Sequence, residues 1–357
     1  MRNNILLALS CVISLAGCSI DPPKQPPQDY DSEFPVETFI RDHLLTAEGL
    51  LRTNMTDRDS EFLSESIGLY LLFLVERKRE NEFADQIAVL TDHFLDESDL
   101  ITWKLDRTGD ALVASPVNAW IDDARIVHAL YEAAQTFDEP EYAELASRIS
   151  VPLTTVATKQ GLPVDYVDLK TNETSDVITL SYLDEAALEW MAPASTLYTN
   201  SKNLLLDAPI DGPFFAKAYS ITDGTYSFDS ELNLIDQVYV ALRYEQFDLP
   251  TDRFYEFFKM VFDSGPVYGR YDRKTQAPTV DYESQAVYAL AVFYLLERDE
   301  PEFAEQVMTR LRGLAVQDET AALYGGYVDV KTRHTHSFDN LLPLLAEGRL
   351  LDGRLIP

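Results

Sequence analysis

SEFLSESIGLYLLFLVERK, residues 60–78, is the stretch that decides the fold. From Ile67 to Leu74 almost every residue is apolar, and the run is longer than an ordinary strand, so it predicts a largely buried helix. Ser64 and Glu65 stand at its beginning, where the unpaired amides of the first turn favour a negative charge. A single Glu at this position usually only complements the helix dipole. A functional role for Glu65 therefore depends on whether similar helix openings recur along the chain.

The pattern recurs along the chain. Acidic residues open further helices at a loose spacing of about 55 residues, and a unit of that length holds two helices and a connection. The six openings are Glu65, Asp122, Asp184, Asp229, Glu283 and Asp339. Six units predict an all-α fold, an (α/α)6 toroid or barrel of six helical hairpins with short β-hairpin connections. An open solenoid of stacked hairpins is the alternative.

A closed ring has a consequence for these acidic residues. Its inner helices run parallel, so their first turns meet at one mouth of the barrel. Carboxyl groups gathered in a partly dry cleft repel one another, so that some stay protonated while others ionise, as general acid and base catalysis requires. Aromatic residues near the openings, among them Trp103, Trp120 and Tyr282, offer flat faces for sugar rings.

The N-terminus predicts export. Residues 1–17 combine Arg2, a short apolar run and small residues before Cys18, which is typical of a cleaved signal peptide. The ending Leu-Ala-Gly-Cys resembles a bacterial lipobox, so we expect Cys18 to carry lipid; an ordinary secretion signal with a chance cysteine is the alternative. Residues 18–34 are proline-rich and predict a tether to a domain over residues 35–357. The lipid would be the only membrane contact, on the outer face of the cell membrane.

Charge and cysteine content narrow the partners. The formal net charge of −31 excludes nucleic acid and an anionic membrane surface as electrostatic partners, and it is compatible with a neutral or cationic substrate. The two cysteines, Cys11 and Cys18, both lie at the N-terminus, so the domain has no thiol pair. The five histidines are scattered. We therefore expect neither a metal ion nor an organic cofactor.

Five segments resemble, in order, motifs of glycoside hydrolase family 8. The segments, each followed by the family's motif in parentheses, are residues 64–70 (S-E-G-x-G-Y), 103–106 (W-x-x-D), 119–127 (A-T-D-x-D-x-x-I-A), 228–230 (Y-D-A) and 284–289 (S-P-A-F-Y-A). The resemblance covers the chain from Pro35 to about Leu350. Three positions depart from the motifs: Ser66 replaces a Gly, Ile121 takes the first Asp of an ungapped match, and Leu232 stands where an Arg is usual.

The resemblance implies residue roles in an inverting glycosidase. Glu65 would be the general acid, Asp229 the general base, and Asp122 would grip the sugar beside the scissile bond. Asp236 is the alternative base, but the sequence places it about two turns further into the helix than Asp229. Residues expected to bind substrate are Asp123, Trp103, Trp120, Tyr282, Tyr288 and Asp106.

The expected function is that of a surface-anchored, endo-acting glycoside hydrolase. Lipoproteins of this type resemble the exopolysaccharide-degrading hydrolases of Gram-positive bacteria, so the expected substrate is an extracellular polysaccharide such as a biofilm matrix, and an exopolysaccharide synthesis system is the expected partner. A non-catalytic, polysaccharide-binding lipoprotein that assists export is the first alternative. A structural toroid that binds another protein is the second.

Overall fold

The computed structural model describes residues 32–353, which contain twelve α-helices and only short strands. This confirms the predominantly helical fold. Cys18, the signal peptide and nearly all of the tether lie outside the described residues. No helix within residues 32–353 combines the length and the apolar content needed to cross a membrane.

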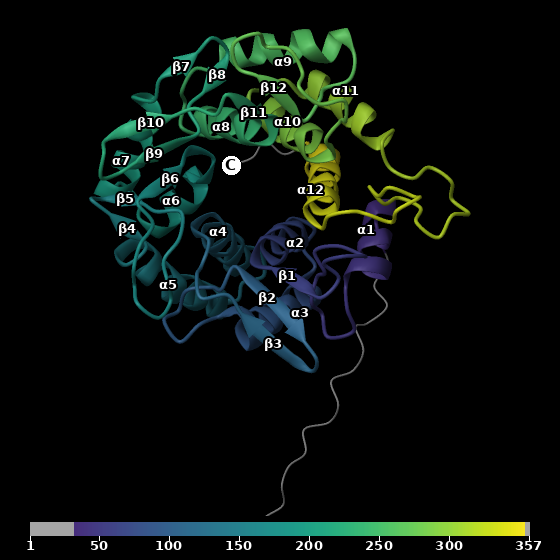
Figure 1. Ribbon diagram of the computed structural model, residues 1–357. Coiled ribbons are helices and arrows are strands. Elements are labelled where there is room, and N and C mark those ends of the chain that lie inside the picture. Colours follow the sequence, from purple (N-terminus) through teal and green to yellow (C-terminus); the bar gives the residue numbers. More distant parts are fainter. Residues whose placement is uncertain (1–31, 354–357) are drawn as a thin grey trace, which may run out of the picture.

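Six helices form a closed ring, seen along its axis in Figure 1. Each contacts the next, and the last returns to the first. In chain order they are α2 (Ser64–Glu76), α4 (Trp120–Thr136), α6 (Glu185–Met191), α8 (Leu234–Gln246), α10 (Gln285–Glu297) and α12 (Phe338–Asp352). This is the arrangement that the spacing of the acidic openings predicts for the inner helices.

A second layer of helices covers the ring from outside (Figure 1). Its members are α1 (Pro35–Phe39), α3 (Glu80–Val89), α5 (Pro140–Thr155), α7 (Thr196–Leu206), α9 (Asp252–Ser264) and α11 (Pro301–Arg312). The helices α3, α5, α7 and α11 each pack on the inner helix that precedes them, and α1 packs on α12. Helix α9 packs through Phe254, whose ring centroid lies 5.8 Å from that of Tyr294 on α10.

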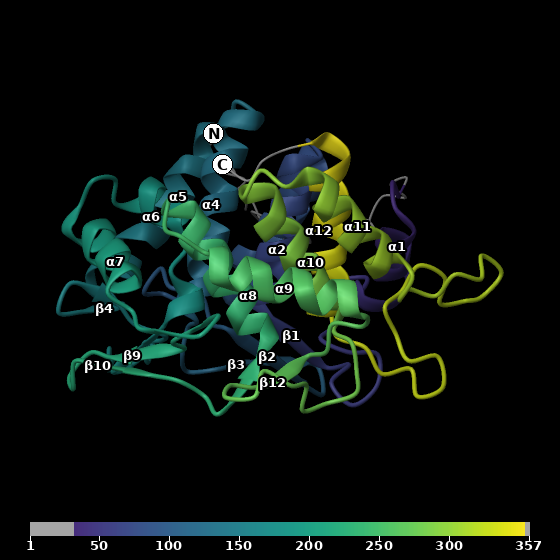
Figure 2. The ribbon, with the colours of Figure 1, turned by 90° about the horizontal axis from the view of Figure 1, so that it is seen from above.

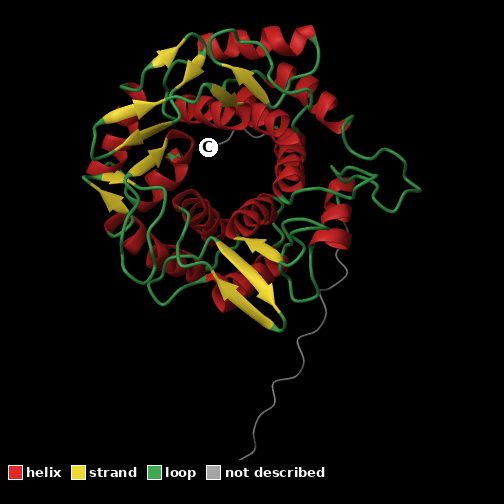
Figure 3. Cartoon of the chain, in the orientation of Figure 1, coloured by secondary structure: helices red, strands yellow, loops and turns green. Residues whose placement is uncertain are grey.

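Short antiparallel strands connect the hairpins (Figure 3), and most of them lie at one end of the ring (Figure 2). The two three-stranded sheets are β1 (Glu61–Leu63), β2 (Lys104–Thr108) and β3 (Ala111–Ala114), and β10 (Thr225–Ser227), β9 (Ala218–Ser220) and β6 (Val177–Thr179). The pairs are β4 (Thr158–Lys159) with β5 (Leu162–Pro163), β7 (Ile210–Asp211) with β8 (Phe214–Phe215), and β11 (Glu231–Asn233) with β12 (Arg270–Asp272).

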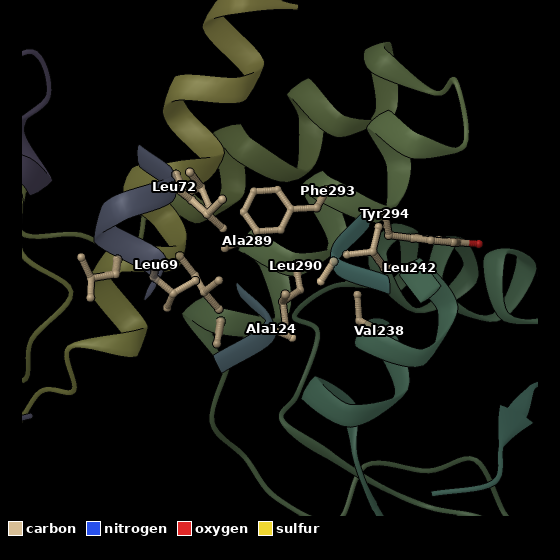
Figure 4. Packing of buried hydrophobic residues seen from close by; sticks show 14 of the residues in the cluster. Leu69, Leu72, Ala124, Val238, Leu242, Ala289, Leu290, Phe293 and Tyr294 are labelled. Atoms are coloured by element: carbon tan, nitrogen blue, oxygen red, sulfur yellow. The ribbon is translucent and has the colours of Figure 1, made fainter. Parts of the chain in front are cut away.

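Helices α2 and α10 are apolar on most sides because they are covered on most sides. In α10 the residues from Ala286 to Leu296 are all buried, and α2 is similarly enclosed. Figure 4 shows Leu69 of α2, Leu242 of α8 and Phe293 of α10 converging between the helices. Burying one such side chain contributes about 1.5–3 kcal/mol, so the ring is held chiefly by this apolar contact.

Inner helices also end alike. The second residue past α2, α4, α8 and α10 has a left-handed backbone, with φ of 56° at Lys78, 59° at Asp138, 58° at Asp248 and 60° at Asp299. This conformation turns the chain back sharply, as a helix C-terminus requires before an antiparallel neighbour. The recurrence at non-glycine residues indicates that each hairpin repeats one geometry.

Two sequence predictions need correction. The 3.6-residue apolar periodicity of residues 35–51 predicts one helix. The structure has only α1 followed by a π-helical turn, Ile40–Leu44, after which Leu45 is extended. The sequence also places Asp229 at the opening of an inner helix. In the structure β11 follows Asp229 and α8 begins only at Leu234, so Asp236 is the acidic residue of its first turn.

Gly326 allows the C-terminal loop to lie against α1. A Cβ atom there would stand 2.3 Å from a ring carbon of Phe39, which is itself buried. We expect Gly326→Ala to lower the free energy of unfolding by about 1–3 kcal/mol through overpacking. Chemical denaturation would measure this. Gly348→Ala is the matched control. Gly348 lies within α12, and a Cβ atom there would stand at an ordinary 3.5 Å from the side chain of Arg77, so this substitution should be neutral or stabilising.

Candidate active site

A pocket of about 270 Å³ lies where the inner helices begin. The first turns of α2, α4, α8 and α12 contribute to its lining, as does a 3₁₀ turn, Leu180–Tyr182, which precedes α6. The lining residues are Leu63, Glu65, Trp103, Ala119, Ile121, Asp122, Arg125, Ser181, Tyr182, Ile235, Asp236, Tyr239 and Phe338. The N-terminal ends of several inner helices therefore share one mouth.

Strand pairing brings distant parts of this lining together. Leu63 of β1 pairs with Lys104 of β2, and the backbone N–H of Ser64 donates to the carbonyl of Trp103 at 3.0 Å. The chain enters α2 directly from β1, so Glu65 lies in the first helical turn beside the Trp103 segment. A sheet contact thus aligns the acidic residue with an aromatic face.

Glu65 is enclosed by protein and partly accessible from the pocket. Burial away from water, together with the nearby charge of Asp122, raises the pKa of Glu65 to about 8, and Arg125 opposes the rise. The negative charge of Asp339 adds to it. A carboxyl group with such a pKa keeps its proton at neutral pH, which is the state that a general acid needs.

Protonation of Glu65 makes stability depend on pH. Its folded pKa, about 8, exceeds the unfolded value of about 4.3, so the folded protein holds an extra proton between these values and loses stability as pH rises through that window. Glu65→Gln has no charge to bury. We expect this variant to melt roughly 2 °C or more above the wild type at pH 8, by calorimetry, with the difference shrinking towards pH 4. Equal melting temperatures at pH 8 would contradict the raised pKa.

Asp122 differs from Glu65 in its partners. Ser64 Oγ donates to Asp122 Oδ2 at 2.9 Å, and Arg125 Nη1 lies 3.1 Å from Asp122 Oδ1. Burial raises the pKa of Asp122, while Arg125 and Ser64 oppose the rise because they stabilise the ionised form. Of the two interacting carboxyls, Asp122 is therefore the one better prepared to carry the charge.

Asp236 lines the same pocket, and Asp229 lies outside its lining. Lys217 connects them, with its Nζ 2.7 Å from Asp229 Oδ2 and 3.8 Å from Asp236 Oδ2. Burial raises the pKa of Asp236, and the positive charge of Lys217 counteracts this. Asp229 does not belong to the pocket lining and its side chain is 43% exposed. The structure thus brings Asp236 to Glu65 and leaves Asp229 in an outer ion pair.

Aromatic side chains form much of the wall. Trp103, Tyr182, Tyr239 and Phe338 all line the pocket, and the Nζ of Lys104 lies 5.6 Å from the centre of the Trp103 ring. Of these, the sequence names only Trp103 as a substrate-binding residue. Flat rings next to carboxylates are suited to a sugar, whose C–H faces pack on them while its hydroxyls are hydrogen-bonded.

Three predicted substrate-binding residues lie instead in the core. Trp120 and Tyr288 have no exposed surface, and the Tyr288 hydroxyl bonds Glu283 and the N–H of Val267. Asp123 is also fully buried, where it accepts hydrogen bonds from Asn118 and the Ile101 amide. Trp120 and Asp123 are buried in the first turn of α4, on which Asp122 also lies, whereas Tyr288 is buried in α10.

Two other predicted residues are exposed outside the pocket. Tyr282 is 51% exposed and its ring covers Gly269, while Asp106 lies on β2 and pairs with Lys104 at 2.9 Å. Neither belongs to the pocket lining. Their aromatic and acidic character alone does not distinguish them from residues of the mouth.

The remaining acidic openings do not line the pocket. Asp184 caps α6 and pairs with Arg243 at 2.8 Å, which lowers its pKa against the effect of burial. Glu283 pairs with Arg310 at 2.6 Å. Asp339, in the first turn of α12, is half-buried, and loss of contact with water raises its pKa to about 6. The six sequence-defined acids therefore separate into a pocket set and a structural set.

Several lining residues have no sequence signal of their own. Tyr239 and Ser181 lie within ordinary helical segments. Lys217, which lies outside the lining but contacts Asp236, precedes the short strand β9. Arg125 lies inside a motif segment but has no predicted role; in the structure it lines the pocket and pairs with Asp122. Within residues 32–353 no group of three or more His, Cys, Asp or Glu side chains is arranged to hold a metal ion.

Comparison with known proteins supplies the family. No family model matches the sequence. The chain is 37% identical over 328 residues to the "Putative lipoprotein YdaJ" of Bacillus subtilis (strain 168), covering 90% of this chain and 88% of that protein.

Solved structures extend the likeness to the fold. A novel alpha-amylase from Clostridium perfringens superimposes with a TM-score of 0.81 at 23% identity, over 88% of this chain and 96% of that one. PssZ from Listeria monocytogenes gives 0.74 at 26% identity, over 91% and 98%. Endoglucanase Cel10 from Klebsiella pneumoniae, a family 8 glycosyl hydrolase, gives 0.64 at 16%, over 89% and 99%. The chain therefore belongs to the same family as YdaJ of Bacillus subtilis and has the fold of the family 8 glycoside hydrolases.

Proposed function

We propose that this protein is an inverting glycoside hydrolase that cleaves an extracellular polysaccharide. The observation that carries the proposal is the pocket shared by Glu65, Asp122 and Asp236, in which one carboxyl keeps its proton and the others can ionise. The family 8 fold supports the reaction class, and we take the closed ring of helix pairs to be the (α/α)6 toroid. Endo action is proposed by analogy with the endoglucanases of this fold.

In the proposed reaction Glu65 donates its proton to the glycosidic oxygen, and Asp236 removes a proton from the attacking water. The C–O bond to the leaving sugar breaks as the new bond to water forms on the opposite face, so the anomeric configuration inverts. Asp229 is the competing base, because the same lysine contacts both carboxylates. Asp236 is preferred since it lines the pocket with Glu65 and is the more enclosed of the two.

Asp122 is proposed to hold the sugar beside the scissile bond. Ser64 and Arg125 leave its carboxylate little freedom, so it can offer a fixed acceptor to sugar hydroxyls. A fixed acceptor favours the distorted ring of the transition state over the relaxed substrate.

The proposed substrate is a neutral or cationic polymer. The net charge of −31 disfavours polyanions, and the wall of aromatic rings suits pyranose faces. We propose an exopolysaccharide of the biofilm matrix as the natural polymer and the system that synthesises it as the functional partner.

Attachment to the outer face of the cell membrane through lipid on Cys18 is a further part of the proposal. It is supported by the sequence around Cys18 and by the name of the Bacillus subtilis relative. Mass spectrometry of the N-terminal peptide from cell membranes would detect the lipid. Release of a Cys18→Ala variant into the medium is expected, and a wild-type chain without lipid would contradict the anchor.

The direct test is incubation of the protein with a panel of bacterial exopolysaccharides, glucans and xylans. Shorter chains detected by mass spectrometry would support the hydrolase, and NMR of the first products should show the inverted anomer. Polymer binding without any chain shortening would instead favour the non-catalytic lipoprotein.

Lys217 should set the acidic limb of the pH profile. Its charge lowers the pKa of Asp236, so removing it raises that pKa, and the base then ionises only at higher pH. We expect Lys217→Met to shift the acidic limb of kcat/KM upward by roughly 0.5 pH unit or more. The control is Lys159→Met, which breaks a comparable pair with Asp176 outside the pocket and should leave the profile unchanged. An unshifted limb in Lys217→Met would argue against Asp236 as the base.

A further inference from the structure

A second hollow, of about 300 Å³, lies between α7 and the β10–β9–β6 sheet, outside the ring mouth. Tyr219 of β9 and Tyr226 of β10 are cross-strand partners, and their ring centroids are 4.8 Å apart at an interplanar angle of 54°. The Tyr226 hydroxyl donates to the Leu204 carbonyl at 2.7 Å, which fixes this ring against α7. The two rings therefore form a rigid, angled aromatic wall.

The rest of the lining consists of three aliphatic side chains, Leu162, Leu204 and Ile221, and of polar side chains that carry almost no charge. Asn200, Asn203 and Gln160 contribute amide side chains, and Asp207 contributes a single carboxylate. Asn200 Nδ2 donates to the Gly161 carbonyl at 3.0 Å, which orients the amide. The lining contains no lysine, arginine or histidine. Amides donate and accept hydrogen bonds equally well, so this surface suits a ligand rich in hydroxyl groups.

The composition of this hollow distinguishes ligand classes. A polyanion would find no cation in the lining and would be repelled by Asp207 and by the net charge of the protein. A purely apolar ligand would bury the amides without partners, which is costly. A neutral sugar satisfies both parts, because its C–H face packs on tyrosine while its hydroxyls meet the amides.

The position of the hollow relates it to the mouth. Strand β6 runs directly into the turn that carries Ser181 and Tyr182 of the pocket, and Lys217 immediately precedes β9. The sheet lies at the same end of the ring as β2 and β12 (Figure 2). One small sheet thus connects the hollow to the wall of the pocket.

We propose that this hollow is a second carbohydrate-binding site that takes neutral pyranoside chains and holds polymer beside the mouth. Binding at the site is independent of catalysis; its role in feeding the mouth rests on the proposed function. The second site should increase the affinity for long chains, whereas it should not change the affinity for oligosaccharides short enough to fill only the mouth.

The test uses isothermal titration calorimetry on Glu65→Gln protein, so that no probe is consumed. The neutral probes are malto- and cello-oligosaccharides and soluble glucans. Chitosan oligomers serve as cationic probes and galacturonate oligomers as anionic ones. We expect Tyr219→Ala to weaken binding of a neutral polymer at least about fivefold. Asn203→Trp, at an exposed position of α7, should block the hollow without disturbing the core. Tyr166→Ala, an exposed tyrosine outside both linings, is the control.

The same substitutions are then made in protein that retains Glu65, and hydrolysis rates are measured. These rates separate the second binding site from the proposed hydrolase function. Turnover of short substrates should be unchanged and turnover of polymer reduced. Unchanged polymer affinity in both Tyr219→Ala and Asn203→Trp would overturn the second site even if the enzyme hydrolyses sugars normally. Binding limited to the charged oligomers would overturn it as well. Sugar binding by a protein with no hydrolytic activity would leave the second site standing and refute the proposed function.

Discussion

Glu65→Gln is expected to reduce hydrolysis of the polysaccharide by roughly 10²–10⁴-fold, the usual contribution of a positioned general acid. The amide keeps the size of the carboxyl but has no proton to donate to the leaving oxygen. Because Glu65 is uncharged at neutral pH in the free protein, the substitution alters little of the ground-state electrostatics. Polymer affinity should therefore persist while kcat falls. Initial rates and calorimetry on the same preparation measure both.

The alkaline limb of the wild-type profile gives an independent check. Glu65 loses its proton as pH rises past about 8, so activity should decline there. Glu283→Gln is the matched control, since Glu283 also precedes an inner helix but pairs with Arg310 outside the pocket. If Glu65→Gln hydrolysed the true substrate at the wild-type rate, the assignment of the acid would fail.

Asp236→Asn should cause a loss of similar size, roughly 10²–10⁴-fold, whereas Asp229→Asn should cost less than about tenfold. The difference follows from their surroundings. Asp236 shares the pocket with Glu65, whereas Asp229 lies outside the lining and pairs with Lys217. Losing the Asp229 charge would remove its direct repulsion of Asp236 and release Lys217, and both effects favour the ionised form of Asp236. Initial rates for both variants, measured side by side, distinguish the two candidates.

Chemical rescue strengthens this comparison. In Asp236→Ala the space of the missing carboxylate can admit azide, which would attack the anomeric carbon and give a glycosyl azide of inverted configuration. Rescue in Asp236→Ala but not in Asp229→Ala identifies the base. The reverse result would make Asp229 the base, as the family resemblance alone suggests, with Asp236 restricted to binding.

The sequence predicts much of the ring because the signals are local. The apolar run through α2 and the first-turn acids Glu65 and Asp122 lie where the periodicity and the motifs indicate. Asp229 is the informative failure. The short strand β11 separates it from α8, and three strand residues are too few to alter a spacing of about 55 residues visibly. A loose period therefore cannot choose between two acids seven positions apart.

The sequence by itself determined the number of helical hairpins, the apolar inner helices and the acidic residues that open most of them. These follow from propensities and from patterns within a few turns of chain. Only the tertiary structure decided which acids meet. Asp184 and Glu283 are neutralised by Arg243 and Arg310, residues distant in sequence, whereas Glu65 faces Asp122 in a pocket that excludes most water. Charge pairing and desolvation depend on what folding brings within a few ångströms, and the order of residues does not contain that distance.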